Sequence, residues 1–246
     1  MLLKLKNIEL VYCMGKKPVK ALDNISIDVE KGDFLSIIGP SGCGKTTILK
    51  IIAELIKPTK GTIIKPDDFE VGYVFQNSTL LKWRSIIENI ALPLEIKGME
   101  KQEAYAKAEE VMNLVDLGEF RDAYPKDLSG GMRHRAAIAR ALVYDPEILL
   151  MDEPFGALDE PTRLKLNVEL NRIWIKTSKT VIFVTHNVSE AVFLSNKVAI
   201  LSKRPANLKK IINIDLPKQR TLELLDSEKY IKQVLEMRKI FSQYAK

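Results

Sequence analysis

Short apolar segments alternate with longer segments of helical periodicity through the middle of the chain. The runs Phe34–Ile38, Ile148–Met151 and Val181–Val184 are apolar along almost their whole length. They are too short to be stable helices, and continuous apolar runs of this length are typical of strands buried on both faces of a sheet. A helical pattern follows each run, beginning with Ile48–Ala53 after the first. This alternation predicts parallel βαβ units and therefore an α/β fold.

Two other parts of the chain have different patterns. Near the N-terminus, Leu3–Leu10 and Ile25–Val29 alternate apolar and polar residues, as half-buried antiparallel strands do. The block from about residue 77 to 145 has no convincing strand, and its stretch Glu100–Asp116 has one apolar face among charges. We therefore expect a core with a mixed sheet, an N-terminal antiparallel β-subdomain and an inserted helical subdomain.

All 246 residues are expected to form a single domain. The core with its β-subdomain is expected at residues 1–76 and 146–205, and the helical subdomain at 77–145. Residues 206–246 form a C-terminal extension, in which Ser227–Tyr244 is predicted to be an amphipathic helix.

Composition narrows the class of protein only slightly. A hydrophobic content of 46% is ordinary for a globular protein. The net charge of +6 fits a nucleic-acid surface, anionic lipid or simple solubility, and we expect the last and no nucleic-acid partner. No apolar run is long enough to span a bilayer, and Met1–Lys6 alternates like a strand rather than a secretion signal. Cys13 and Cys43 lie far apart, so we expect neither a disulfide nor a cysteine metal site, which fits a reducing compartment.

A glycine-rich segment with the order G-x-x-x-x-G-K-T lies between the first apolar run and its helix, at Gly39–Thr47. Glycines let the backbone wrap tightly and point several N–H groups inward, and the helix N-terminus adds partial positive charge. Lys45 adds a full positive charge, and Thr46 places a hydroxyl where Mg²⁺ would lie. This arrangement predicts a site for a nucleotide phosphate.

Two further segments carry candidate chemistry. The apolar run at 148–151 ends in Asp152 and Glu153, where one carboxylate is suited to Mg²⁺ and the next to activating a water as general base. The alternative is a solvated acidic turn. Ser129-Gly130-Gly131 opens a helix, and it is either a second anion-binding helix end or a plain capping turn. The residues alone leave that choice open.

Five motifs in order resemble those of the ATP-binding subunits of ABC transporters. They are Gly39–Thr47, Gln76, Leu128–Met132, Met151–Asp159 and His186. The resemblance extends to about residue 205 and implies a P-loop NTPase core with ATP as substrate and Mg²⁺ as cofactor. It also implies that the signature turn at residues 128–132 contacts the ATP of a second subunit.

The resemblance implies a role for each matching residue. Lys45 is expected on the β- and γ-phosphates, Glu153 as the catalytic base and His186 as the switch histidine that bonds the γ-phosphate. Thr46, Gln76 and Asp152 are the implied metal ligands. The implied nucleotide-contacting residues are Tyr12, Gly39, Pro40, Ser41, Gly42, Cys43, Gly44, Lys45, Thr46, Thr47, Gln76, Ser129, Gly130, Gly131 and Asp159.

Two of these assignments have alternatives. Tyr12 occupies the place of the aromatic residue that stacks on adenine, but it is also compatible with a core tyrosine at a strand end. Trp83, with the leucines before it, is compatible either with a groove for a coupling helix of a membrane subunit or with packing inside the helical subdomain.

The residues around these motifs resemble those of the importer branch for nitrate, sulfonates and taurine. Lys82 and His134 depart from it, since that branch usually has Pro and Gln there. The implied assembly is a homodimer of ATP-binding subunits at the cytoplasmic face of the membrane. Its implied partners are permease subunits and, through them, an extracytoplasmic solute-binding protein. A soluble ABC-type ATPase without transport and the nucleotide-binding half of an exporter are the alternatives.

Overall fold

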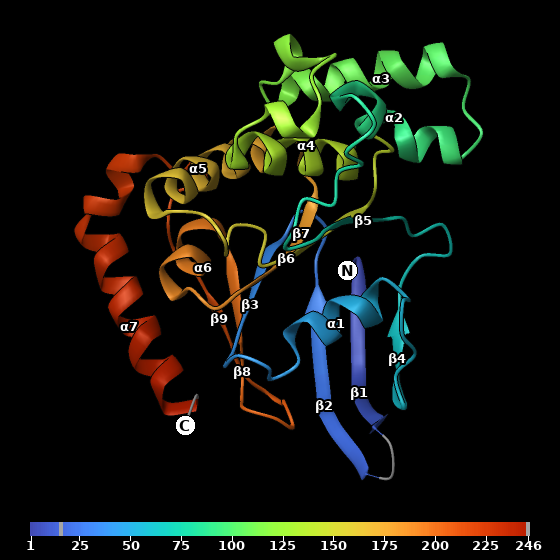
Figure 1. Cartoon of the computed structure of the whole chain (residues 1–246). Helices are drawn as coiled ribbons and strands as arrows, with labels where there is room; N and C mark the ends of the chain where they lie inside the picture. The colour runs from blue at the N-terminus through green and yellow to red at the C-terminus, as the bar shows by residue number, and fades with distance from the viewer. Residues whose placement is uncertain (15–16, 245–246) are drawn as a thin grey trace.

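Two sheets form the framework of the computed structural model, which describes residues 1–14 and 17–244 (Figure 1). The larger, six-stranded sheet has the order β5-β6-β7-β3-β8-β9, and its strands are parallel except for the antiparallel edge strand β9. Their bounds are β5 Val71–Val74, β6 Ile148–Asp152, β7 Thr180–Thr185, β3 Phe34–Ile38, β8 Lys197–Leu201 and β9 Leu208–Asn213. The predicted α/β class with a mixed sheet is confirmed.

The central strands are buried on both faces, as their apolar sequences predict. On β3, Phe34 and Ile38 belong to the hydrophobic cluster shared with the helices, whereas Leu35 and Ile37 belong to the cluster under the smaller sheet. Because alternate residues of a strand point to opposite faces, this one strand contributes to both cores. The large sheet therefore lies between the two hydrophobic clusters and contributes side chains to both.

The smaller sheet is antiparallel, with strand order β2-β1-β4 and bounds β1 Leu3–Met14, β2 Lys17–Val29 and β4 Lys60–Ile64. The alternation in the sequence correctly predicts its two longer strands, although both extend further than predicted. At Gly61 of β4, a Cβ would lie 2.4 Å from the carbonyl oxygen of Asn7. Only glycine allows the two strands to approach this closely there.

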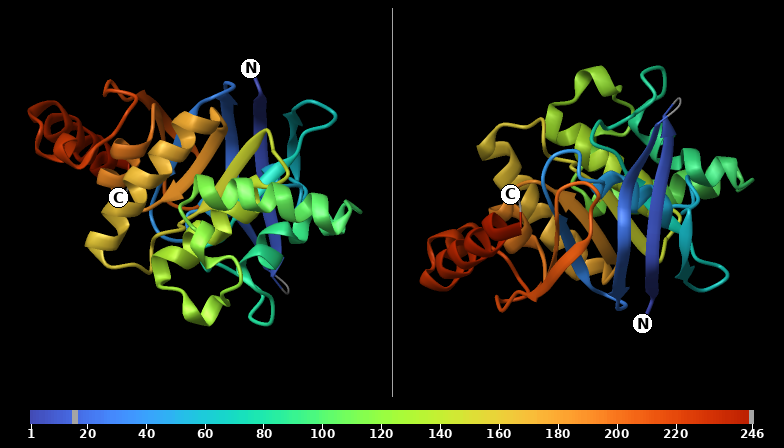
Figure 2. Two further views of the ribbon diagram at one scale, coloured as in Figure 1. Left: turned by 90° about the horizontal axis from the view of Figure 1, so that it is seen from above. Right: turned by 90° about the horizontal axis from the view of Figure 1, so that it is seen from below.

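The helical subdomain confirms the prediction that this block lacks strands, within the residues described. It contains α2 (Ile86–Ile96), α3 (Lys101–Leu114) and α4 (Gly130–Leu142), with short 3₁₀ turns at Gly118–Phe120 and Pro125–Asp127. Ser85 and Glu88 form a capping box that begins α2. The three helices pack together over the β5 end of the large sheet (Figures 1 and 2).

The remaining helices are α1 (Lys45–Ile52), α5 (Glu160–Thr177), α6 (Val188–Leu194) and α7 (Glu228–Tyr244). Asp159 caps α5, since its side chain accepts a hydrogen bond from the Thr162 N–H, and Pro161 lies in the first turn. Helix α7 was predicted, and it lies at the side of the molecule opposite β4 (Figures 1 and 2). Strand β9 and the 3₁₀ turn Leu222–Asp226 were not predicted. β9 is an edge strand with half-exposed apolar residues and exposed lysines, so it lacks a buried-strand pattern.

Two observations on residues 1–14 and 17–244 concern membrane-spanning helices and cysteines. No helix there is both long and apolar enough to cross a bilayer. Cys13 is exposed, Cys43 is buried and both are free thiols.

His134 lies buried at the junction between the helical subdomain and the core. Its ring, on α4, meets Phe155 edge to face with centroids 6.1 Å apart. Burial, followed by the charge of Arg133, lowers the pKa of His134 below its ordinary value of 6.5. The folded protein therefore holds His134 neutral at pH values where an unfolded chain protonates it.

We predict that stability falls as the pH decreases below about 6.5, because the unfolded state then binds more protons than the folded state. His134→Gln removes this contribution. The melting temperature of the parent should therefore fall more between pH 7.5 and 5.5 than that of the variant, by about 2 °C or more. Thermal melts followed by circular dichroism measure this, and an equal loss in both proteins would contradict the assignment.

Candidate functional site

The glycine-rich loop connects β3 to α1 at the carboxyl edge of the large sheet. Gly44 immediately precedes α1 with φ 125°, and a Cβ there would lie 2.8 Å from the Leu22 side chain. Both the backbone angle and the space thus require glycine. Lys45 is only 5% exposed, and its Nζ donates to the carbonyl oxygens of Gly39 at 3.0 Å and Pro40 at 3.3 Å. The ammonium group is therefore held inside the curve of the loop.

The rest of the loop divides into an outer and an inner part. Ser41 and Gly42 are exposed, whereas Cys43 is buried beneath them. Burial raises the pKa of the Cys43 thiol. The backbone N–H of Cys43 donates to the carbonyl oxygen of Pro40. Thr47 lies in the first turn of α1, and its Oγ1 is 3.4 Å from the hydroxyl of Tyr12. Tyr12 is exposed, so it borders the loop and is not a core tyrosine.

Thr46 and Asp152 meet although 106 positions separate them. The Thr46 hydroxyl donates to Asp152 Oδ1 at 2.8 Å. Burial raises the pKa of Asp152, and the bond from Thr46 opposes that shift. A hydroxyl and a carboxylate beside a phosphate loop are the hard oxygen donors that Mg²⁺ prefers. Within the described residues no group of three or more His, Cys, Asp or Glu is placed to hold a metal ion.

Glu153 links the other charged groups. Its Oε1 lies 3.7 Å from Lys45 Nζ, and its Oε2 lies 2.9 Å from His186 Nδ1. The Glu153 backbone has φ 45°, in the left-handed region that non-glycine residues seldom adopt, and its N–H bonds to Val184 of β7. Such strain at a polar cluster is typical of functional sites. The His186 side chain is 58% exposed, so part of its ring remains accessible while Nδ1 contacts Glu153.

Gln76 lies two residues after the end of β5 and near the same cluster. A Cβ on Gly156 would be 3.7 Å from Glu153 Oε2 and 3.8 Å from Gln76 Nε2. Both side chains therefore border the turn at Gly156. Gln76 is exposed, which leaves its amide free to turn toward a ligand.

The structure keeps Ser129, Gly130, Gly131 and Asp159 apart from this cluster. Ser129 caps α4 by accepting a bond from Met132, and Asp159 caps α5. The two glycines face the beginning of α5. No hydrogen bond or ion pair among residues 1–14 and 17–244 joins these four residues to Lys45, Glu153 or His186. Ser129 lies at the start of α4 and Asp159 at the start of α5, whereas Lys45 begins α1 and Glu153 follows β6.

Arg204 is a neighbour of the loop that the sequence did not reveal. It lies in the turn between β8 and β9, and its Nη2 donates to the Gly42 carbonyl at 2.6 Å. No motif marks this arginine, because it reaches the loop only through the pairing of β3 with β8. It contributes a second positive charge at the outer side of the loop.

The comparisons with known proteins agree with this geometry. A family model described as "ABC transporter" matches residues 22–156. An uncharacterized ABC transporter ATP-binding protein of Methanocaldococcus jannaschii is 46% identical over 243 residues, covering 96% of this chain and 91% of that protein. An aliphatic sulfonates import ATP-binding protein of Bacillus cereus is 41% identical over 243 residues, covering 96% and 95%.

A solved structure is similar as well. It is described as a dimeric post-hydrolysis state of an ATP-binding cassette bound to ADP and phosphate. Its TM-score is 0.75 at 34% identity, covering 88% of this chain and all of that one. The chain therefore belongs to the family of ABC transporter ATP-binding proteins. It is an ATPase subunit that binds and hydrolyses ATP, as the resemblance predicted.

We predict that Arg204→Gln weakens ATP binding by about 3- to 10-fold, because the loop loses one charge-assisted hydrogen bond. Titration with a fluorescent ATP analogue measures the affinity. Lys203→Gln is the matched control, since it removes an equal charge from the exposed neighbouring position. If both variants weaken binding equally, general charge and not the contact with Gly42 is responsible.

Proposed function

We propose that this protein powers a membrane importer for a small solute, with an alkanesulfonate or a related small anion as the favoured class. The observation that carries the ATPase part is the convergence of Lys45, Glu153 and His186 beside the Thr46–Asp152 pair. The relatives named as aliphatic sulfonate import proteins support the transport part.

Two copies of the chain complete the site in this proposal. The capping turn Ser129–Gly131 has exposed or half-exposed residues, and among the described residues it has no hydrogen bond to Lys45. A helix N-terminus with free N–H groups attracts a phosphate, so the turn of one copy is suited to the γ-phosphate bound by the other. The similar cassette described as a dimer supports this arrangement.

The roles of the residues follow from their chemistry. Lys45 binds the β- and γ-phosphates, and Glu153 accepts a proton from the water that attacks the γ-phosphorus in line with the leaving ADP oxygen. His186 orients Glu153 and donates to a γ-phosphate oxygen. Thr46, Asp152 and Gln76 would hold Mg²⁺, which supplies charge neutralisation at the phosphates when bound. Tyr12, at the edge of the loop, is suited to stacking on adenine.

We predict that Glu153→Gln still binds ATP but hydrolyses it about 100-fold more slowly or worse, because the amide cannot accept the proton. With ATP this variant should accumulate as a dimer in size-exclusion chromatography. Lys45→Ala should instead lose ATP binding by about tenfold or more. Hydrolysis at the parent rate by either variant would overturn the proposed site.

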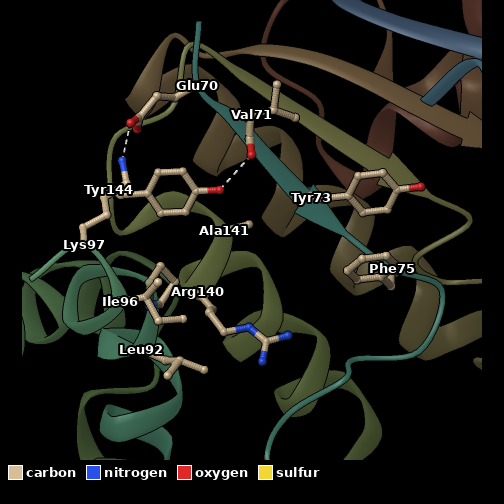
Figure 3. A pocket seen from close by; sticks show the side chains of 11 residues that line it. Glu70, Val71, Tyr73, Phe75, Leu92, Ile96, Lys97, Arg140, Ala141 and Tyr144 are labelled. Atoms are coloured by element: carbon tan, nitrogen blue, oxygen red, sulfur yellow. Dashed lines mark hydrogen bonds and ion pairs between the residues drawn. The ribbon is translucent and has the colours of Figure 1, made fainter. Parts of the chain in front are cut away.

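The proposed membrane contact is a groove of about 540 Å³ between β5 and helices α2 and α4 (Figure 3). Its lining is largely apolar and includes Phe75 and Ile96, and Ile96 is 76% exposed. An apolar groove exposed at the surface marks an interaction site more often than a single exposed apolar side chain does. We propose that the groove receives a short cytoplasmic helix of the permease.

The groove is connected to the nucleotide side of the molecule. Phe75 directly precedes Gln76, and Arg140 of the lining bonds to the carbonyl oxygens of Ser78 and Thr79. A helix seated there would therefore bear on the segment that carries Gln76. Trp83 is 74% exposed, so it does not pack within the helical subdomain and is available to the same partner.

We predict that Ile96→Asp weakens copurification of the permease by about tenfold or more, because a buried charge would replace an apolar contact. In proteoliposomes the variant should also lose stimulation of its ATPase by binding protein loaded with an alkanesulfonate. Ile231→Asp on α7 is the matched control, since Ile231 is also exposed but lies far from the groove. Failure of the parent to bind any permease would favour an ATPase without transport.

A further inference from the structure

Helix α7 is joined to the first turn of α6 by two hydrogen bonds that end on one residue. The Tyr230 hydroxyl donates to the Ser189 carbonyl at 3.0 Å, and Arg238 Nη2 donates to Ser189 Oγ at 3.0 Å. The Tyr230 ring also packs edge to face on Phe193, with centroids 6.3 Å apart. Tyr230 is buried, so its hydroxyl has little access to water as an alternative partner.

From Ser189 the bonds continue toward the histidine. Asn187 Oδ1 accepts from the backbone N–H groups of Ser189 at 2.9 Å and Glu190 at 3.2 Å. The Asn187 N–H donates to Thr185 Oγ1 at 3.0 Å, and that hydroxyl donates to Glu190 Oε2 at 2.5 Å. The residues on both sides of His186 are therefore fixed to the same helical turn.

The turn needs this outside support. Helix α6 has only seven residues, and a helix so short is unstable unless tertiary contacts hold it. Beside it lies a polar pocket of about 150 Å³, lined among others by Arg163, Glu190 and Arg238. Glu190 is 6% exposed, burial raises its pKa, and its Oε1 has no hydrogen-bond partner among the described residues. Residues 191–194 of α6 are buried in the hydrophobic core, whereas Val188 and Ser189 in its first turn are only half-buried. The bonds from α7 therefore attach the part of α6 that core packing holds least.

We infer that α7 positions the switch histidine: Tyr230 and Arg238 hold Ser189, and through Asn187 and Thr185 they keep His186 opposite Glu153. This inference rests on the proposed role of His186 in ATP hydrolysis. His186 is largely exposed and its bond to Glu153 at 2.9 Å is its one side-chain hydrogen bond within residues 1–14 and 17–244. Its placement therefore depends on the backbone around it. Tyr230 and Arg238 are positioning residues, since neither reaches the nucleotide loop.

The test compares Tyr230→Phe with Tyr244→Phe in the full-length chain. The first variant keeps the ring and removes only the bond to Ser189, while Tyr244 lies on the same helix and its hydroxyl has no hydrogen bond among the described residues. We expect Tyr230→Phe to lower kcat for ATP hydrolysis by about 3- to 10-fold with KM within about twofold. Hydrogen exchange at the amides of residues 187–190 should rise. Tyr244→Phe should change neither.

A double variant shows whether the effect passes through the histidine. In a His186→Ala background, Tyr230→Phe should cause no further loss of kcat, because the group that it positions is already absent. Arg238→Ala, at an exposed position, is a second variant expected to act in the same direction without unfolding the protein. Additive losses in the double variant, or parent kcat in both Tyr230→Phe and Arg238→Ala, would overturn the inference.

The outcome separates this inference from the proposed function. If His186→Ala itself leaves hydrolysis unchanged, the proposed role of the histidine fails. If His186→Ala abolishes hydrolysis while Tyr230→Phe and Arg238→Ala have no effect, the catalytic site stands and only the positioning role of α7 is wrong.

Discussion

Parallel pairing of β6, β7 and β3 is the constraint on which the site depends. In this register Asp152 lies beside Val184, and Thr185 lies beside Ile38. The carboxyl ends of all three strands therefore meet at one edge of the sheet, where residues more than 100 positions apart become neighbours. The bond from Glu153 to Val184 extends this pairing one residue past β6 and brings the carboxylate to His186.

The core and the parts that surround it contribute different features to this edge of the sheet. The core side contributes buried groups, such as Lys45, whose positions are set by close packing and backbone hydrogen bonds. The helical subdomain and α7 contribute surfaces and supports, which reach the site through β5 and α6 respectively. The first route reaches the sheet at its edge strand β5, and the second reaches it at the central strands β3 and β7.

Much of this organisation could be predicted from local patterns. The buried strands, the helix that begins after Ser129, and helix α7 were predicted from the sequence and are confirmed. Strand β9 was not predicted, because an edge strand exposes half of its residues and has no buried pattern. Arg204 carried no signal either, since a charged residue in a turn is usually solvated.

By itself the sequence determined the glycine-rich loop, the fold class and the family, because spacing and hydrophobic period are local properties that survive without coordinates. Only the tertiary structure decided which predicted groups meet. It joined Thr46 to Asp152 and His186 to Glu153, and it kept Ser129 apart from them. It also joined α7 to Ser189, in the first turn of α6 that follows His186. Such meetings depend on strand order and register, and these are fixed by packing between segments distant in the chain.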